Sequence, residues 1–287
     1  MESQIKLRCL KSDDLSAADK LREAAGWNQT LMDWHRLLTL DTEGCFVAVD
    51  QNQVVGTATT VSFGTELAWI GMVLVDSARR NQGIGRLLLN KCLDYLRTKG
   101  VRCIKLDATP AGQILYEKLG FQVEWPLARW MKIEAARPNI ALPIRAAISA
   151  IADDWNEILE LDRQVFGVDR SVLLQLLRKE SAQTLVYRGT DGGLGGFGFM
   201  RDGMNADYIG PVVAKTEEAG KAIMHRLLCA SQRPVYWDIP GPCAVGAAWA
   251  AQLGFIQQRP LVRMCLGRNV AAGTPSQLWA ISDPATG

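Results

Sequence analysis

Apolar residues in the first half of the chain follow two patterns that alternate along the sequence. Short apolar runs bounded by turn residues predict strands, and apolar positions repeated every three or four residues predict helices. One helical stripe runs through residues 84, 88, 92 and 96, and Gly100 follows it where a left-handed backbone is favoured. The predicted strands are residues 5–9, 45–50, 53–63, 67–75, 101–107 and 121–133, and the predicted helices are residues 12–25, 30–38, 83–98 and 111–119. This order indicates an α/β fold in which helices flank a mixed sheet.

The same landmarks recur in the second half of the chain. An aromatic residue, Ile-Gly, a hydrophobic run, a charged loop and a helical pattern follow one another in two segments. These are AWIGMVLVDSARRNQGIGRLLL from Ala68 and DYIGPVVAKTEEAGKAIMHRLL from Asp207. Likewise, CIKLDATPAGQILYEKLGF from Cys103 matches VYWDIPGPCAVGAAWAAQLGF from Val235. A repeat of this kind predicts two copies of one fold. We place the first domain at residues 1–136 and the second at residues 137–287, with the joint inside residues 134–143, where two prolines interrupt any regular element.

Composition narrows the class of protein. The 287 residues include 32 basic and 30 acidic side chains, so a nucleic-acid partner is not expected. The apolar runs are too short to cross a membrane, and the first residues are too polar for a secretory signal. The seven cysteines are scattered and the two histidines lie far apart, which predicts reduced thiols, no metal site and a cytoplasmic location.

The segment RRNQGIGRLLL, residues 79–89, carries the most specific chemistry in the chain. A glycine-rich turn that enters a helix is typical of a phosphate site. The segment lacks the lysine of a P-loop, and it has Leu88 where a dinucleotide fingerprint needs a third glycine. Moreover, seven residues separate Gly83 from the end of the preceding strand, whereas the dinucleotide motif begins directly at the strand.

The pattern Arg80-x-x-Gly83-x-Gly85 instead resembles the acyl-CoA motif of the GNAT superfamily of N-acetyltransferases. LYEKLGF, residues 115–121, is similar to a second hallmark of that family. The resemblance implies tandem GNAT-like domains, each a twisted mixed sheet with flanking helices, and acetyl-CoA as the co-substrate. Glycines at a helix start suit this ligand, because the bare backbone can approach a diphosphate and the helix presents unpaired N–H groups to it.

The resemblance also implies which residues act on the donor. Tyr116 matches the family tyrosine that protonates the departing CoA thiolate, and a phenol can do this near neutral pH. The strand before the loop is expected to splay from its neighbour at a bulge, so that its backbone binds the pantetheine arm. The expected cofactor-binding residues are Met72, Val73, Leu74, Val75, Arg80, Asn81, Gln82, Gly83, Ile84, Gly85 and Arg86.

The acceptor side is less well defined by the sequence. Trp27 and Asn28 fall where acceptor pockets of the family are usually lined, and Tyr208 and Asp238 of the second copy are further candidates. The proton acceptor stays open between a water chain and a carboxylate such as Asp238. Glu66 precedes the relevant strand position by three residues, so it is expected to face the other side of the strand.

The second copy has lost the cofactor signature. Its loop reads KTEEAGK, residues 215–221, where two glutamates replace the arginine–glycine pattern, and Ala250 stands at the tyrosine position. It resembles the C-terminal domain of a two-domain subgroup of the superfamily. We expect a scaffold that covers the acceptor side of the first domain.

These patterns together predict an N-acetyltransferase. It would use acetyl-CoA to acetylate a primary amine of a small molecule by direct attack, as a monomer or a homodimer. Two alternatives remain from other classes of protein. One is a non-catalytic acyl-CoA sensor, and the other is a structural or partner-binding protein with a vestigial loop.

Overall fold

The computed structural model describes residues 5–133, 146–269 and 272–287, so the expected joint at residues 134–143 lies outside the described residues. The strands are β1 (Lys6–Cys9), β2 (Phe46–Asp50), β3 (Gln53–Phe63), β4 (Leu67–Val75), β5 (Cys103–Ala108), β6 (Gln122–Lys132), β7 (Ile148–Ser149), β8 (Gln183–Arg188), β9 (Leu194–Arg201), β10 (Asp207–Ala214), β11 (Val235–Pro240), β12 (Ile256–Gly267) and β13 (Leu278–Ala280). The α-helices are α1 (Leu15–Ala24), α2 (Leu31–Leu40), α3 (Ile84–Thr98), α4 (Pro110–Lys118), α5 (Trp155–Phe166), α6 (Ser171–Glu180), α7 (Glu217–Ala230) and α8 (Ala244–Gln252).

The elements of the first half form where the hydrophobic pattern predicts them. β3 and β4 have the predicted bounds, and the predicted helix at residues 83–98 begins one residue later, at Ile84. Local chemistry fixes several ends. Thr30 caps α2 by accepting a hydrogen bond from the amide of Asp33, and the Asp33 carboxylate accepts one from the amide of Thr30. Gly100, with φ +70°, follows α3 as expected.

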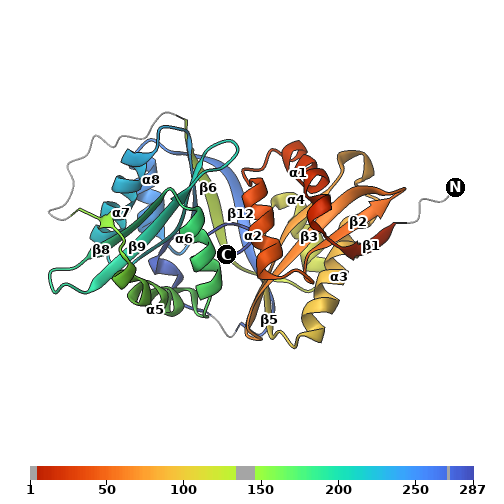
Figure 1. Cartoon of the computed structure of the whole chain (residues 1–287), viewed down its shortest axis with the longest axis horizontal. Coiled ribbons are helices and arrows are strands. Elements are labelled where there is room, and N and C mark those ends of the chain that lie inside the picture. The colour runs from red at the N-terminus through yellow and green to blue at the C-terminus, as the bar shows by residue number, and fades with distance from the viewer. Residues whose placement is uncertain (1–4, 134–145, 270–271) are drawn as a thin grey trace.

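All strands join one sheet that runs through both halves (Figure 1). Its order is β1-β2-β3-β4-β5-β12-β6-β11-β10-β9-β8-β7, and β13 pairs with β10 outside this path. The final strands of the two halves are exchanged: β12 pairs with β5 of the first half, and β6 pairs with β11 of the second half. The central four strands β5-β12-β6-β11 therefore alternate between the two halves of the chain. The sequence repeat did not predict this exchange.

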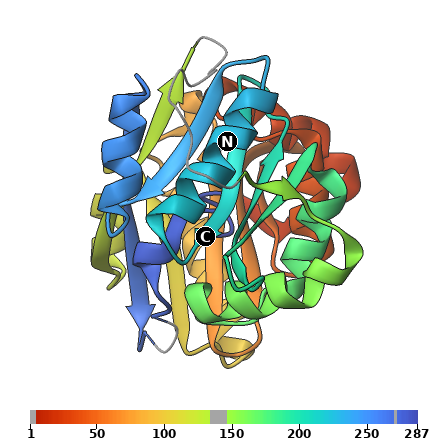
Figure 2. The same ribbon diagram turned by 90° about the vertical axis from the view of Figure 1, so that its left-hand side faces the viewer.

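Helices cover both faces of the sheet (Figure 2). α1 and α2 lie on the same face as α5 and α6, and their apolar side chains merge into one core that includes Trp34, Leu161 and Leu173. On the other face the two halves keep separate cores, one under α3 and one under α7. α2 and α6 meet across the divide, where Arg36 forms ion pairs with Asp33 and Glu180.

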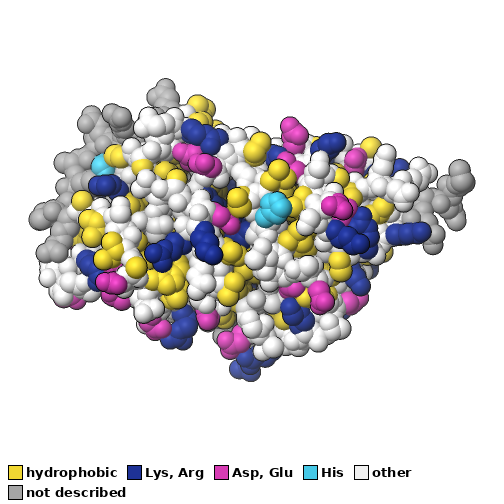
Figure 3. Space-filling view, in the orientation of Figure 1, with side chains coloured by type: hydrophobic (Ala, Val, Ile, Leu, Met, Phe, Trp, Pro, Cys, Tyr) yellow, Lys and Arg dark blue, Asp and Glu magenta, His cyan; other side chains and the backbone are white. Residues whose placement is uncertain are grey.

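The molecular surface carries both signs of charge. On the face seen in Figure 3, basic and acidic side chains are interspersed. In the part of the chain that the structure describes, no helix combines the length and apolar character needed to cross a bilayer. Nor do the histidines, cysteines and acidic residues of these described segments gather in threes where they could hold a metal ion.

Candidate functional site

The parallel strands β4 and β5 separate partway along their length. They pair at three positions, the last being Trp69 with Lys105. Beyond this point β4 stays paired with β3 but passes through a register shift opposite Thr57–Thr59. Met72 there adopts a left-handed backbone with φ +48°, and its carbonyl accepts a hydrogen bond of 2.7 Å from the Thr57 hydroxyl. Beyond Trp69, the edge of β4 that faces β5 therefore has no strand partner among the described residues. This is the splayed strand with a bulge that the resemblance implies.

The glycine-rich loop lies at the carboxyl end of β4. Gly83 has φ +79° and starts α3, and this left-handed conformation favours glycine. A methyl group built at Gly83 would meet nothing within 4 Å, and one at Gly85 would meet only two side chains at 3.8 Å. Asn81, Gln82 and Arg86 are exposed, whereas the Ile84 side chain anchors the helix in the core. The backbone at the start of α3 is therefore open to a diphosphate, and its helix dipole favours a negative charge.

The two adjacent arginines of the loop differ in their contacts. Arg79 forms an ion pair of 2.7 Å with the buried Asp50 at the end of β2, which ties the loop to the β2–β3 hairpin. Arg80 is exposed and makes one long hydrogen bond, from its Nε to the Val75 carbonyl, at 3.4 Å. Arg80 thus keeps most of its donors available for a phosphate, as the motif implies, and Arg79 serves the fold.

Tyr116 faces the opening from α4. Its ring packs edge-on against Phe121, with centroids 6.0 Å apart, and it lines a pocket together with Met72 and Val73 of the bulge. Burial raises the pKa of the Tyr116 phenol to about 12, so the hydroxyl stays protonated at neutral pH. No hydrogen bond from this hydroxyl to another described residue is present. The proton is thus free to be donated into the pocket.

The pocket beside Tyr116 draws on both halves of the chain. Its lining consists of Trp27, Gln29, Ile70, Gly71, Met72, Val73, Leu106, Asp107, Thr109, Tyr116, Arg259, Leu261, Pro284 and Ala285. The last four belong to the second half: Arg259 and Leu261 reach the pocket through the exchanged strand β12. The sequence motifs indicated Trp27, Met72, Val73 and Tyr116. Nothing in the sequence placed Arg259 there, because the strand exchange that brings it is a tertiary feature.

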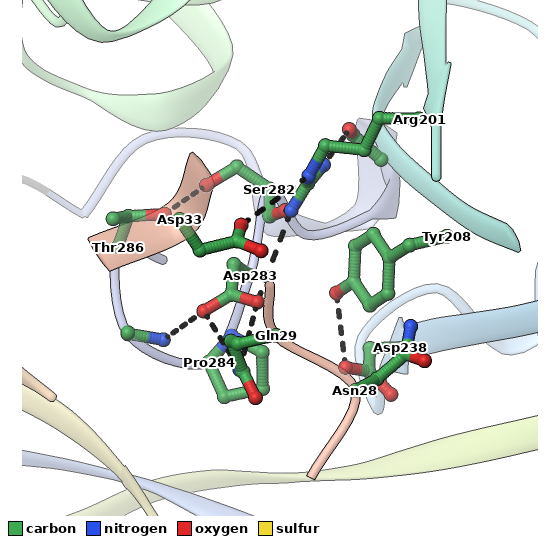
Figure 4. A network of polar contacts seen from close by, with 12 residues as sticks. Asn28, Gln29, Asp33, Arg201, Tyr208, Asp238, Ser282, Asp283, Pro284 and Thr286 are labelled. Carbon is green, nitrogen blue, oxygen red and sulfur yellow. Dashed lines mark hydrogen bonds and ion pairs between the residues drawn. The ribbon is translucent and has the colours of Figure 1, made fainter. Parts of the chain in front are cut away.

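The segment 282–287 crosses over β4 and closes the pocket on one side. The Trp69 indole donates a hydrogen bond of 3.0 Å to the Pro284 carbonyl. A methyl group built at Gly71 would lie 2.5 Å from the Cα of Ala285, so this close approach requires a glycine. The Gln29 amide donates to the Asp283 carboxylate at 3.1 Å (Figure 4). A segment of the second half thus forms one wall of a pocket that opens on the first.

Three of the four acceptor-side candidates lie outside the pocket lining. Asn28 is buried and holds the chain between β9 and β10: it donates to the Ala206 carbonyl at 3.0 Å and accepts from two amides. The Tyr208 hydroxyl donates to Asp238 at 2.9 Å (Figure 4). Arg129 makes two hydrogen bonds to the same carboxylate, at 2.8 and 2.6 Å. Burial alone would raise the pKa of Asp238, but Arg129 holds it below its usual range. The structure gives these three residues partners within the protein, and only Trp27 reaches the pocket.

The carboxylates near the reaction centre are also engaged. Asp107 lines the pocket, and both of its oxygens accept hydrogen bonds from Arg263, at 2.8 and 2.9 Å. Burial raises the pKa of Asp107, although Arg263 opposes this shift. Glu66 is exposed and pairs with Arg102 at 3.1 Å. Asp107 is therefore the carboxylate that the described pocket lining offers, and its sequence context did not indicate it as a proton acceptor.

The corresponding opening of the second half is filled. β10 and β11 also pair at three positions and then separate. β13 occupies the space, pairing with β10 at Val212 and Val213, and the Trp237 indole donates to the Trp279 carbonyl at 2.7 Å. The Trp279 ring packs on Gly220 in the first turn of α7, so closely that a methyl group there would overlap it. The second half thus holds its own β13 and Trp279 where the first half has an open loop.

Both halves of the chain match models of one family. Residues 13–121 match the acetyltransferase (GNAT) family, and residues 158–280 match an acetyltransferase (GNAT) domain. The uncharacterized N-acetyltransferase YitH of Bacillus subtilis is 31% identical over 174 residues, 61% of either chain. The holothin acyltransferase of a Pseudoalteromonas species is 25% identical over 195 residues, 68% of this chain and 64% of that protein. The matches span about three fifths of the length of these curated relatives.

Solved structures share the whole architecture. A proposed acetyltransferase from Pyrococcus horikoshii aligns with a TM-score of 0.85 at 23% identity, over 100% of this chain and 97% of that one. A tandem GNAT protein from the clavulanic acid biosynthesis pathway aligns with a TM-score of 0.68 at 16% identity, over 92% and 98% of the two chains. At these identities the likeness to solved structures concerns the fold alone. The family is shown by the two matching models, which describe acetyltransferases. The chain belongs to the GNAT family of acyltransferases and carries two of its domains in tandem.

Proposed function

We propose that the first domain binds acetyl-CoA and transfers its acetyl group to a primary amine of a small molecule. The observation that carries this proposal is that the parts of a donor site occur along one strand. The glycine turn that starts α3 follows the carboxyl end of β4, the edge of β4 separates from β5 after Trp69, and Met72 and Val73 of β4 line a pocket with Tyr116. In this proposal residues 1–136 are the catalytic domain, and residues 137–287 cover the acceptor side.

The loop fits the donor by its backbone. Gly83 and Gly85 leave space over the start of α3, where N–H groups and Arg80 can bind a diphosphate. The residues proposed to contact the cofactor are the eleven expected from the motif, from Met72 to Val75 and from Arg80 to Arg86. Acetyl-CoA, when bound, supplies the activated acyl group. The first half alone offers this cradle among the described residues, since Trp279 covers the start of α7.

The transfer needs a proton donor and an oriented amine. The amine nitrogen attacks the thioester carbonyl, the new C–N bond replaces the C–S bond, and Tyr116 gives its proton to the departing thiolate. Backbone N–H groups at the bulge would stabilise the negative charge that develops on the carbonyl oxygen. Asp107 is the lining carboxylate available to take the proton that the amine loses.

The walls of the pocket favour a small acceptor. The pocket is enclosed by side chains from the connection between α1 and α2, from β12 and from the segment 282–287. The flat surface of a folded protein therefore does not fit into it. One relative is named a holothin acyltransferase, and one structural neighbour comes from the clavulanic acid pathway, which supports a metabolite as substrate. The absence of disulfides among the seven cysteines, all of which lie in the described segments, supports a reducing, cytoplasmic location.

Calorimetry with acetyl-CoA, followed by measurement of thiol release across a panel of primary amines, tests this function. We expect one acetyl-CoA per chain and amine-dependent thiol release. Tight binding without turnover on any amine would indicate an acyl-CoA sensor instead. Absence of binding to any acyl-CoA would contradict both and leave a structural role.

A further inference from the structure

Arg259 reaches the pocket without a hydrogen-bond or ion-pair partner among the residues that the structure describes. It stands on β12 at a register shift opposite β6 and lines the pocket beside Trp27. Its guanidinium carbon lies 5.9 Å from the centre of the Trp27 ring. The side chain is half-buried, and its Nε is fully shielded from solvent with no hydrogen-bond acceptor in the described structure. A shielded guanidinium nitrogen without an acceptor costs free energy in the ligand-free protein.

The other arginines that are buried or half-buried each have a carboxylate within ion-pairing distance. These pairs are Arg22 with Asp19, Arg36 with Asp33 and Glu180, Arg79 with Asp50, Arg129 with Asp238, Arg170 with Asp162, Arg188 with Asp154, Arg201 with Asp283, Arg233 with Asp207 and Arg263 with Asp107. Among the arginines in the described segments, Arg259 combines shielding with the lack of such a pair. The difference is therefore specific to the arginine in the pocket wall.

The acidic groups nearest to Arg259 are already engaged. Arg129 donates to Asp238 from its Nε and Nη2, and Arg263 donates to Asp107 from the same two nitrogens. Asp283 accepts hydrogen bonds from Gln29 and from the Ala285 amide. Burial and the charge of Arg129 lower the pKa of Arg259, yet a guanidinium remains charged at neutral pH. The pocket thus presents a positive charge that no neighbouring carboxylate neutralises directly.

We propose that Arg259 binds a carboxylate on the acceptor, so that the substrate class is amino acids or other amino carboxylic acids. This inference rests on the proposed acetyl transfer to an amine in the same pocket. The planar fork of a guanidinium matches a carboxylate, and Trp27 and Leu261 supply an apolar wall for the rest of the molecule. Arg259 belongs to the wall built by the second domain, whereas the diphosphate cradle belongs to α3 of the first. The second domain would therefore select the acceptor by charge.

The test compares amines that differ only in the acidic group. Glycine, β-alanine and phenylalanine are each paired with the corresponding carboxamide, and kcat/KM is measured by thiol release with acetyl-CoA. A carboxamide also changes the reactivity of the neighbouring amine, so the quantity of interest is the change in the carboxylate-to-amide ratio between wild type and Arg259→Leu. We expect this ratio to fall by about tenfold or more, the effect of a charged hydrogen bond, and to recover partly in Arg259→Lys. Arg226→Leu, which removes an exposed arginine of α7, is the matched control and should leave the ratio unchanged.

Calorimetry of the same amino acids against the CoA-loaded and the free protein gives a readout without turnover. Binding to wild type that is lost in Arg259→Leu supports the inference, even if acetyl transfer itself were disproved. Turnover of the amines with an unchanged ratio in Arg259→Leu would overturn it while leaving the proposed function intact. It would also be overturned if wild type bound none of the amino acids, or if Arg259→Leu weakened acetyl-CoA binding as strongly as amino acid binding.

Discussion

At the scale of single residues, the candidate site depends on groups that the fold leaves without internal partners. The Tyr116 hydroxyl and most donors of Arg80 have none among the described residues, whereas Arg79, Asp238 and Tyr208 have ion-pair or hydrogen-bond partners within the protein. A polar group that already has its partners gains little from a ligand, whereas a free donor gains a full interaction. The lack of internal partners therefore distinguishes the two proposed donors, Tyr116 and Arg80, from neighbours such as Tyr208.

Tyr116→Phe removes the proposed proton donor while keeping the ring that packs on Phe121. We expect kcat to fall by about a hundredfold or more, with an unchanged Kd for acetyl-CoA. Because burial raises the pKa of Tyr116 to about 12, ionisation of this residue should not reduce the wild-type rate between about pH 7 and 10. Steady-state kinetics and calorimetry check both statements. Loss of acetyl-CoA binding in parallel with kcat would show that Tyr116 has a structural role.

The two loop glycines should respond differently to substitution. Gly85→Val puts a side chain over the start of α3. The folded protein accommodates it, so stability should change little, but the side chain occupies the space proposed for the diphosphate. Acetyl-CoA affinity should therefore fall by about tenfold or more. Gly83→Ala instead forces a side chain into φ +79°, which should cost about 1 kcal/mol of stability. Urea unfolding and calorimetry on both variants test the contrast. Equal loss of stability in the two would contradict it.

At the scale of elements, the exchanged strands are joined by buried ion pairs. Arg129 of β6 and Asp238 of β11 stand directly opposite each other, and Arg263 of β12 stands opposite Asp107 of β5. Each pair links a strand of one half to a strand of the other. Misplacing either strand by one residue would leave buried charges unpaired, so these pairs help to specify the register.

Asp238→Asn should therefore destabilise the protein strongly. Arg129 would remain buried without a counter-charge, at a cost of roughly 3–5 kcal/mol. The lowered pKa of Asp238 means that its stabilising contribution is present above the ordinary aspartate range and is lost as the pH falls through its folded-state pKa. The decline in unfolding free energy on acidification should thus be smaller in Asp238→Asn. Urea unfolding as a function of pH measures both effects.

Glu66→Gln is the control for this variant. It removes the exposed pair with Arg102 and should change stability by less than about 1 kcal/mol. If Asp238→Asn were equally mild but abolished turnover, Asp238 would belong to the reaction and not to the strand exchange.

At the scale of the whole molecule, neither half completes its own sheet. β5 finds its partner in β12, and β6 lies between two strands of the second half. The apolar core under α1 and α2 continues into α5 and α6. Each domain thus depends on the other for backbone hydrogen bonds as well as for packing.

This dependence predicts the behaviour of a divided chain. Residues 1–136 expressed alone should not give a stable monomer, because β5 and β6 would expose unpaired edges. Co-expressed with residues 137–287 as a separate chain, they should form a stable complex that binds acetyl-CoA. Co-purification and light scattering check this result. A stable monomer of residues 1–136 with full acetyl-CoA affinity would contradict it.

The hydrophobic pattern by itself determined most of the local structure, and the motif resemblance indicated the proposed donor side of the site. The strand Gln53–Phe63 and the glycine-rich loop before α3 were predicted because their information is local: periodicity, turn residues and glycines act over a few positions. The repeat also identified two related halves. Tyr116 could be proposed because LYEKLGF resembles a family motif in which a tyrosine precedes the phenylalanine by five residues.

Only the tertiary structure decided how the two halves combine. A sequence repeat is compatible with separate or exchanged strands, because the alternation of apolar and polar residues in a strand does not name the strand that pairs with it. The exchange carries Arg259 into the pocket and makes Asp238 a partner of Arg129, which removes it from the acceptor wall. It also brings Pro284 and Ala285 onto β4, more than 200 residues away in the chain. The acceptor side is thus built from long-range contacts, which no local pattern encodes.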